Sequence, residues 1–201
     1  MTALLQSTYD ETVIAVSDSG KWEQELLHFK FTMPAGIEKL DVNFDGNSWR
    51  KLTLQQGTGS WHFQTTVSTA LRSDTNKTNQ SPQSLARPFY RVKLGIRTEI
   101  RIPAIDADGD FIKCRIAEYV EGGYIAIHPP PNVEVSENCS VYINASESEK
   151  YTDDSWIGVP VSVRDYNKEK ITYGKDDSIP GKFSLSATTV QMHLADQKRG
   201  K

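Results

Sequence analysis

Three aspartates are the residues of this chain whose type and spacing could most directly do chemistry. Asp106, Asp108 and Asp110 stand at every second position around Gly109, in the stretch IPAIDADGDFIKCRIA. This spacing can put three carboxylates on one side of a looped backbone, and calcium takes six to eight oxygen ligands. Aspartate and glycine are also favoured in tight turns for backbone reasons alone. The stretch therefore predicts either a calcium site or a solvated Asp-Gly turn between two strands.

An EF-hand is not the form that a calcium site would take in this chain. The sixth position of such a loop carries Phe111 in place of glycine, and the twelfth carries Ala117 in place of the bidentate glutamate. The missing ligands would have to come from distant loops, and we expect them from Asp165, with Asp153 and Asp154 as other candidates. Calcium is the one cofactor that the sequence suggests.

Signatures of catalysis are otherwise missing from the sequence. No Gly-x-Ser-x-Gly, His-Glu-x-x-His or phosphate-binding glycine loop occurs, and the four histidines lack the spacing of zinc ligands. The acid pairs Asp153–Asp154 and Asp176–Asp177 are expected to be solvated in loops, although a carboxylate pair could support glycoside hydrolysis. We therefore expect that the protein is not an enzyme, with a β-sandwich hydrolase as a further alternative.

Two tryptophans could bind a ligand of another kind. Trp49 and Trp61 are predicted on adjacent strands of a hairpin, where they could share one face and stack on sugar rings. The alternative is that both side chains pack in the core or half-buried on their strands. A lectin-like carbohydrate-binding domain is accordingly the main alternative to a structural module.

Composition and charge exclude several classes of protein. The chain has 201 residues, 37% hydrophobic and 24% charged, with a net charge of −3. No basic patch favours nucleic acid, and no stretch approaches the roughly 20 apolar residues of a membrane span. No secretory signal is visible in MTALLQSTYDE, so we expect either a cytosolic protein or a segment of a secreted precursor.

Strands are the elements that must position these residues, because apolar and polar residues alternate in many short segments. The expected strands are 13–16, 26–31, 40–44, 49–54, 61–67, 90–94, 98–102, 111–116, 133–135, 141–143, 157–163 and 188–194. Residues 40–67 are predicted to form a three-strand meander, and Pro160 indicates an edge or a bulge within its strand. So many short strands separated by turns predict an all-β sandwich.

A polar segment divides the chain. Residues 70–88 are rich in turn formers and are expected to be a long loop or a connection between half-domains. We therefore expect two packed β half-domains, an N-terminal meander or sandwich half over residues 1–88 and a second β-sandwich half over residues 89–201.

A series of motifs follows in a fixed order along the chain. They are Phe44–Trp49, Trp61–Thr65, Arg72–Asp74, Asn79–Pro82, residues 102–117, Cys139, Val161–Tyr166 and Leu185–Gln191. This order resembles an uncharacterised repeat module in large secreted or cell-surface proteins of marine invertebrates. The second half, closing on GVPVSVRDY, also resembles immunoglobulin-like and cadherin-like extracellular modules. The resemblance implies an Ig-like or cadherin-like sandwich for the second half and an extracellular setting.

The two cysteines, Cys114 and Cys139, could form a disulfide between neighbouring strands or remain two buried thiols. The family that the chain resembles usually has an E-C-G-G-x-C loop, and here the matching residues 120–125 lack both cysteines. By this resemblance, retention of Cys114 and Cys139 alone implies that these two pair with each other. A disulfide would in turn imply an oxidising compartment.

Four asparagines, Asn76, Asn79, Asn138 and Asn144, begin glycosylation sequons. Together with the resemblance they favour a glycoprotein. We therefore expect a non-catalytic extracellular structural, adhesive or recognition module of a matrix or cell-surface protein, present here as a fragment or mature segment. Its partners would be proteins, glycans or other copies of itself, without nucleic acid binding or membrane insertion.

Overall fold

The computed structural model describes residues 8–18, 22–30, 32, 36–37, 39–46, 52–55, 61–87, 89–153, 155–173, 177–179 and 184–196. The chain divides into two compact units, Met1–Glu38 and Lys39–Lys201. Residues on both sides of the expected division between 88 and 89 belong to the second unit.

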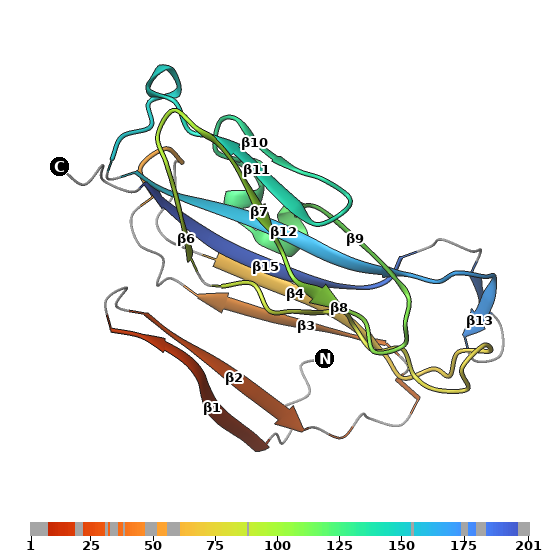
Figure 1. The fold of residues 1–201 in the computed structure, drawn as a ribbon. Coiled ribbons are helices and arrows are strands. Elements are labelled where there is room, and N and C mark those ends of the chain that lie inside the picture. The colour runs from red at the N-terminus through yellow and green to blue at the C-terminus, as the bar shows by residue number, and fades with distance from the viewer. Residues whose placement is uncertain are drawn as a thin grey trace. The chain divides into compact units, whose positions relative to one another are not determined.

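The first unit contains a hairpin of two antiparallel strands, β1 (Thr8–Ser17) and β2 (Trp22–Lys30) (Figure 1). The strand predicted at 13–16 is confirmed as part of β1, and the one predicted at 26–31 is confirmed up to residue 30, because residue 31 lies outside the described residues. An isolated two-stranded hairpin buries little apolar surface. The side chains of Val13, Ile14 and Val16 are correspondingly exposed.

Two sheets enclose the core of the second unit. The first has the strand order β6 (Phe89–Val92), β15 (Ser184–Asp196), β12 (Trp156–Tyr166), β9 (Phe111–Ile116). The second has the order β10 (Val133–Val135), β11 (Ser140–Asn144), β7 (Arg97–Arg101). Buried residues from both sheets form one cluster, including Val92, Ile100, Cys114, Val141, Ile143, Val159 and Val161. The predicted all-β, sandwich-like fold is confirmed.

The central strand β12 carries the longest buried row of the core. Val159, Val161 and Val163 alternate along it, and each is 0% exposed. Side chains at alternate positions of a strand lie on one face. Asp165 continues this row at the next alternate position and is also 0% exposed. A carboxylate therefore ends a row of buried valines.

Pro160 does not mark an edge strand, because β12 lies between β15 and β9. The pairing with β9 extends only from Val161 to Tyr166, and the Pro160 carbonyl accepts a hydrogen bond from the backbone N–H of Ala117 at 3.0 Å. The nitrogen and the carbonyl of one strand residue point to the same side. Pro160 therefore lacks its N–H at the place where β9 has ended, and no sheet hydrogen bond is lost there.

Further elements complete the second unit. They are β3 (Lys39–Gly46), β4 (Trp61–Ser68), β5 (Gln83–Ser84), β8 (Ala104–Ile105), β13 (Ile171–Tyr173), β14 (Asp177–Ile179), α1 (Tyr119–Gly122), α2 (Tyr124–Ile127) and a 3-10 turn, Glu147–Glu149. The predicted three-strand meander is wrong, because β3 pairs directly with β4. The described residues 52–55 are not a strand; the Gln55 side chain instead bonds both backbone groups of Gly158, at 2.6 and 2.9 Å.

One disulfide joins the two sheets. Cys114 lies on β9, and Cys139 comes directly before β11, with 4.8 Å between their Cα atoms. Both residues are buried, at 2% and 7% exposure. The pairing implied by the sequence resemblance is therefore present.

Candidate functional site

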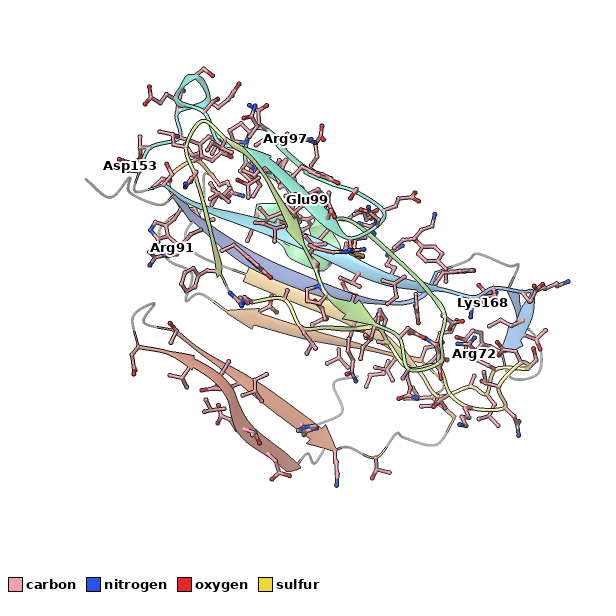
Figure 2. The ribbon with its side chains drawn as sticks, in the orientation of Figure 1. Arg72, Arg91, Arg97, Glu99, Asp153 and Lys168 are labelled. Atoms are coloured by element: carbon pink, nitrogen blue, oxygen red, sulfur yellow. A yellow bond between two sulfur atoms is a disulfide. The ribbon has the colours of Figure 1, made fainter. Side chains whose placement is uncertain are left out.

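A buried arginine, Arg72, organises the most highly charged part of the second unit (Figure 2). Its side chain is 1% exposed, and it holds Asp74 with two hydrogen bonds, from Nε at 3.0 Å and from Nη2 at 2.7 Å. Nη1 and Nη2 both also donate to Asp110, and Nη1 donates to the Asn79 Oδ1 at 2.6 Å. One guanidinium therefore binds two carboxylates and an amide.

The backbone around Arg72 is fixed by local and long-range hydrogen bonds. The Arg72 N–H donates to the Lys77 carbonyl at 2.9 Å, which closes a tight turn. The next residue, Ser73, donates its N–H to the Thr172 carbonyl at 2.9 Å, so that the turn lies against β13. Residues 71–78, which the sequence presents as a polar loop, are thus an ordered support for the arginine.

The three aspartates of the sequence motif form a turn between β8 and β9. Gly109 has a positive φ of 75°, and the Asp106 Oδ1 accepts the backbone N–H groups of Asp108 at 3.0 Å and Asp110 at 2.9 Å. The Asp-Gly turn is therefore present with Ala107 and Gly109 exposed, but two of its carboxylates are shielded from solvent. The side chains of Asp108 and Asp110 are only 4% and 5% exposed.

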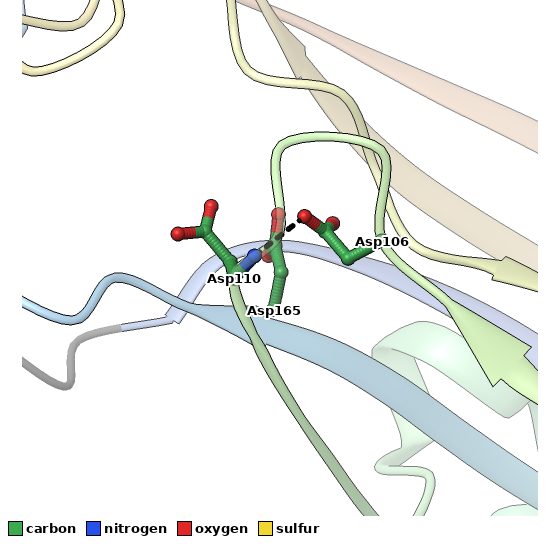
Figure 3. A group of neighbouring side chains, drawn as sticks. All are labelled: Asp106, Asp110 and Asp165. Carbon is green, nitrogen blue, oxygen red and sulfur yellow. Dashed lines mark hydrogen bonds between the residues drawn. The ribbon is translucent and has the colours of Figure 1, made fainter.

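Carboxylate oxygens of Asp106, Asp110 and Asp165 lie within 4.8 Å of one another, where the turn meets the end of β12 (Figure 3). Asp165 also accepts a hydrogen bond from the Asn79 Nδ2 at 2.7 Å. Of the four aspartates predicted as metal ligands, this group includes three. Asp108 is directed elsewhere, because its Oδ2 accepts the Gln80 N–H at 2.7 Å and lies 3.7 Å from Arg72.

Burial and neighbouring charges shift the pKa values of this region. Burial raises the pKa of Asp106, and the charges of Asp110 and Asp108 raise it further. Hydrogen bonds from Arg72 lower the pKa of Asp74. Burial lowers the pKa of the Arg72 guanidinium, but the hydrogen bonds and charges of Asp110 and Asp74 outweigh it and raise the pKa overall. The cation is therefore held permanently charged, and the charged form of Asp106 is disfavoured.

Three polar atoms in the region are buried with no hydrogen-bond partner among the described residues. They are the Asp106 Oδ2, the Tyr173 hydroxyl and the Thr75 hydroxyl. Tyr173 is 8% exposed, and burial raises its pKa to about 12. Buried polar groups almost always have a partner. The Asp106 Oδ2 and the Tyr173 hydroxyl can therefore each take a further polar partner.

A second charged cluster surrounds Glu121 of α1, which is 6% exposed. Its carboxylate accepts from Arg115 at 3.1 Å, from Arg164 at 3.0 Å, from the Ser162 hydroxyl at 2.9 Å and from the Glu118 N–H at 2.8 Å. Burial opposes ionisation, but these donors outweigh it and lower the pKa of Glu121. The cluster ties α1 to β9 and β12.

The predicted glycosylation residues divide into two groups. Asn76, Asn138 and Asn144 are exposed, which a glycan requires. Asn79 is half-buried, and its amide nitrogen donates to Asp165. A glycan on that nitrogen would have to break this contact, so Asn79 belongs to the Arg72 cluster.

The predicted stacking pair stays untested. Trp49 lies outside the described residues, and Trp61 begins β4 but its side chain lies outside the described part. Of the acids considered for hydrolysis, Asp153 is exposed, whereas Asp154 and Asp176 also lie outside the described ranges. Trp156 is half-buried, with its ring centroid 6.3 Å from that of Phe89.

Sequence reasoning did not identify Arg72, Asn79 or Tyr173 as parts of one site. Arg72 and Asn79 fall in two of the motifs that carry the family resemblance, which is the signal that could have drawn attention to them. Tyr173 alternates with Ile171 on β13 but gives no sequence signal of its own.

No described helix has the length and apolar character needed to cross a bilayer. Comparison with family models, with curated proteins and with solved structures finds no match to this chain.

Proposed function

We propose that this chain is a non-catalytic extracellular module that serves as a structural, adhesive or recognition unit of a matrix or cell-surface protein. The observation that carries the proposal is the buried Cys114–Cys139 disulfide between the two sheets. Disulfides form and persist in oxidising compartments and are rare in the cytosol. The three exposed sequons, at Asn76, Asn138 and Asn144, are compatible with passage through a secretory route.

The engagement of the buried acids also supports a non-catalytic role. The carboxylates of Glu121 and Asp110 are each held by arginines through two or more hydrogen bonds. A general acid or base must instead reach the substrate proton that it transfers. These acids therefore support the architecture better than they support acid–base chemistry.

The compartment is tested by peptide mapping under non-reducing conditions, on chain secreted from eukaryotic cells. We expect one peptide pair linked through Cys114 and Cys139 and glycans on at least one exposed sequon. Two free thiols in secreted material would count against the extracellular module.

A lectin-like function is the second candidate, and one surface feature favours it. A shallow recess of about 230 Å³ is lined by Arg97, Asn132, Glu134, Tyr142 and Asn144 on the three-stranded sheet. The Arg97 guanidinium lies 4.5 Å from the centroid of the Tyr142 ring. Aromatic rings with planar polar side chains around them suit the apolar faces and hydroxyl groups of sugars.

A glycan array separates the two candidates, with a Tyr142→Ala variant as the matched control. A lectin predicts defined glycan binding that the variant loses, whereas a scaffold predicts no glycan binding. Sedimentation equilibrium on the same samples tests for self-association, the expected property of a scaffold. A glycan on Asn144 would cover the recess, so occupancy of that sequon would itself argue against sugar binding there.

A further inference from the structure

The carboxylates around Arg72 carry more negative charge than its single guanidinium can neutralise. Two carboxylates of the turn, Asp108 and Asp110, lie against the Arg72 guanidinium, and their side chains are at most 5% exposed. Asp74 shares the guanidinium at 36% exposure, and the fully buried Asp165 adds a further carboxylate close to Asp106 and Asp110. Excess buried charge is strongly unfavourable unless a proton or a cation neutralises it. The imbalance therefore requires one or the other.

The unpartnered atoms point to the same place. The Asp106 Oδ1 is used by two backbone N–H groups, which leaves its buried Oδ2 directed to no described donor. The Tyr173 hydroxyl, also without a partner, lies within the electrostatic influence of the same cluster, first of Arg72 and then of Asp165 and Asp110. A water molecule could satisfy one hydrogen bond, but it would leave the charge unbalanced. A cation with its own water shell would meet both requirements.

The spacing of the oxygens indicates the size of the cation. Two ligands of one ion can lie no farther apart than twice the metal–oxygen distance, about 4.6–5.2 Å for calcium and about 4.2 Å for magnesium. The ligand atoms of Asp106, Asp110 and Asp165 lie within 4.8 Å of one another (Figure 3). Each pair of oxygens therefore lies within the limit for calcium. Asp110 can serve the ion and Arg72 together, because each carboxylate oxygen has two lone pairs.

We propose that Asp106, Asp110 and Asp165 bind one calcium ion at the end of the β12 valine row. The Asp106 Oδ2 is its principal free ligand, and water fills the remaining positions beside the Tyr173 hydroxyl. The ion ties the β8–β9 turn to β12, and Arg72 and Asn79 join the 71–80 segment to the same point. Asp108 is not a ligand. The inference does not depend on the proposed function, although sites of extracellular modules bind calcium at 10⁻⁴–10⁻³ M in order of magnitude, which suits that setting.

The test is thermal unfolding and calorimetric titration of the full chain, stripped with chelator and then given calcium chloride or magnesium chloride. We expect calcium at about 100-fold above its Kd to raise the melting temperature by roughly 5–10 °C. Magnesium at the same concentration should have a smaller effect. No heat and no shift of melting temperature at about 10–100 mM calcium, 100-fold above this range of Kd, would overturn the proposal, and an equal response to magnesium would overturn its choice of ion.

The decisive variant is Asp106→Asn, which keeps an oxygen to accept the two N–H groups but removes the charge. Without calcium it should melt at or above the wild-type temperature, because a disfavoured charge is gone. With calcium it should bind at least roughly tenfold more weakly. The control is Asp153→Asn, at an exposed aspartate on the opposite end of the unit from Arg72 (Figure 2), which should respond to calcium as the wild type does.

A variant that is merely misfolded would melt below the wild type both with and without calcium. Loss of an ion ligand should instead lower the melting temperature relative to wild type only when calcium is present. Asp165→Asn is a second variant that should also lose the calcium response. If Asp106→Asn keeps the full calcium shift, the ion is not bound by this triad. If neutralisation is by protons alone, stability will depend on pH identically with and without calcium, which would also overturn the proposal.

Discussion

The two buried charged clusters of the second unit are built on opposite plans. Around Arg72, one guanidinium is surrounded by carboxylates and an amide. Around Glu121, one carboxylate is surrounded by two guanidiniums, a hydroxyl and a backbone N–H. In both, the central group is almost fully buried, at 1% for Arg72 and 6% for Glu121.

The clusters differ in where their excess charge lies. The arginines around Glu121 are 31% and 30% exposed, so water can solvate the surplus positive charge. Asp108 and Asp110, near Arg72, are 4% and 5% exposed, so water reaches the surplus negative charge poorly. The burial of the central charge therefore does not distinguish the two clusters. The accessibility of the surrounding charges does, and it is what favours the calcium ion that we propose for the Arg72 cluster.

The largest effect should come from removing the central cation. Arg72→Met leaves Asp74 and Asp110 without their shared partner, and breaking a buried ion pair in this way costs about 3–5 kcal/mol of the free energy of unfolding. Denaturant unfolding measures the loss. Arg97→Met, at an arginine whose side chain is 63% exposed, should cost no more than about 1 kcal/mol. Similar losses for both would mean that burial of the Arg72 cluster adds nothing.

Loss of the disulfide should have an effect on the free energy of unfolding that lies between those of removing Arg72 and removing the charge of Glu121. Replacing Cys114 and Cys139 by alanine opens a link across 25 residues, for which the entropy of the unfolded chain predicts a loss of about 3 kcal/mol. Unfolding of the double variant, compared with wild type in oxidised form, measures it. A single Cys114→Ala variant should lose nearly as much. A double variant as stable as the wild type would show that the bond constrains nothing.

Removing the central carboxylate should cost less than removing the central cation. Glu121→Gln should lose about 2 kcal/mol, because hydrogen bonds to a charged group become ordinary ones while its arginines remain partly solvated. The matched control is Glu118→Gln, whose side chain is 69% exposed. Equal losses in the free energy of unfolding for Arg72→Met and Glu121→Gln would contradict the idea that the exposure of the surrounding charges distinguishes the two clusters.

The effect of Glu121→Gln on stability should also depend on pH. The pKa of Glu121 in the folded chain is below its ordinary value of 4.5, so its stabilisation is present above pH 4.5. It is lost as the pH falls through the folded-state pKa. The difference in stability between wild type and Glu121→Gln should therefore shrink in acid, and unfolding curves from pH 7 to pH 3 would measure it. A difference that stays constant over this range would contradict the role of the charged form.

The smallest expected effect on stability is at the sequons, where glycan occupancy should distinguish Asn76 from Asn79. Secreted chain should carry glycan at Asn76 but not at Asn79, whose amide nitrogen donates to Asp165. Glycopeptide mass spectrometry reads the occupancy of each. Asn76→Gln should leave stability unchanged within about 0.5 kcal/mol. Full occupancy of Asn79 would show that its contact with the Arg72 cluster is dispensable.

The strands were predictable where alternation was long and one face was buried. The alternation of Val159, Val161 and Val163 gives β12 its inward face, and the same phase places Asp165 inward. The third meander strand was not predictable in this way. Leu52 is buried at 8%, but outside any strand, and its neighbours bond to β12 through Gln55 and Thr53.

The candidate site was only partly predictable, because periodicity indicates a face but not a partner. Three of the four aspartates proposed as ligands come together, since the turn and the end of β12 are adjacent in the sheet. The cation at their centre could not be inferred. Arg72 lies 38 residues from Asp110 in sequence, inside a segment whose composition indicated only a loop.

The disulfide makes residues 115–138 a covalently closed loop, and this loop contains α1, α2 and the three prolines 129–131. Its helices expose apolar side chains, with Tyr119 and Val120 each 59% exposed and Ile127 52% exposed. A protease that cuts in this loop would leave both fragments attached through sulfur. The cut chain would migrate as one species on a non-reducing gel and as two fragments after a reductant is added. In an oxidising environment, a single cut in this loop would therefore not separate the two parts of the chain.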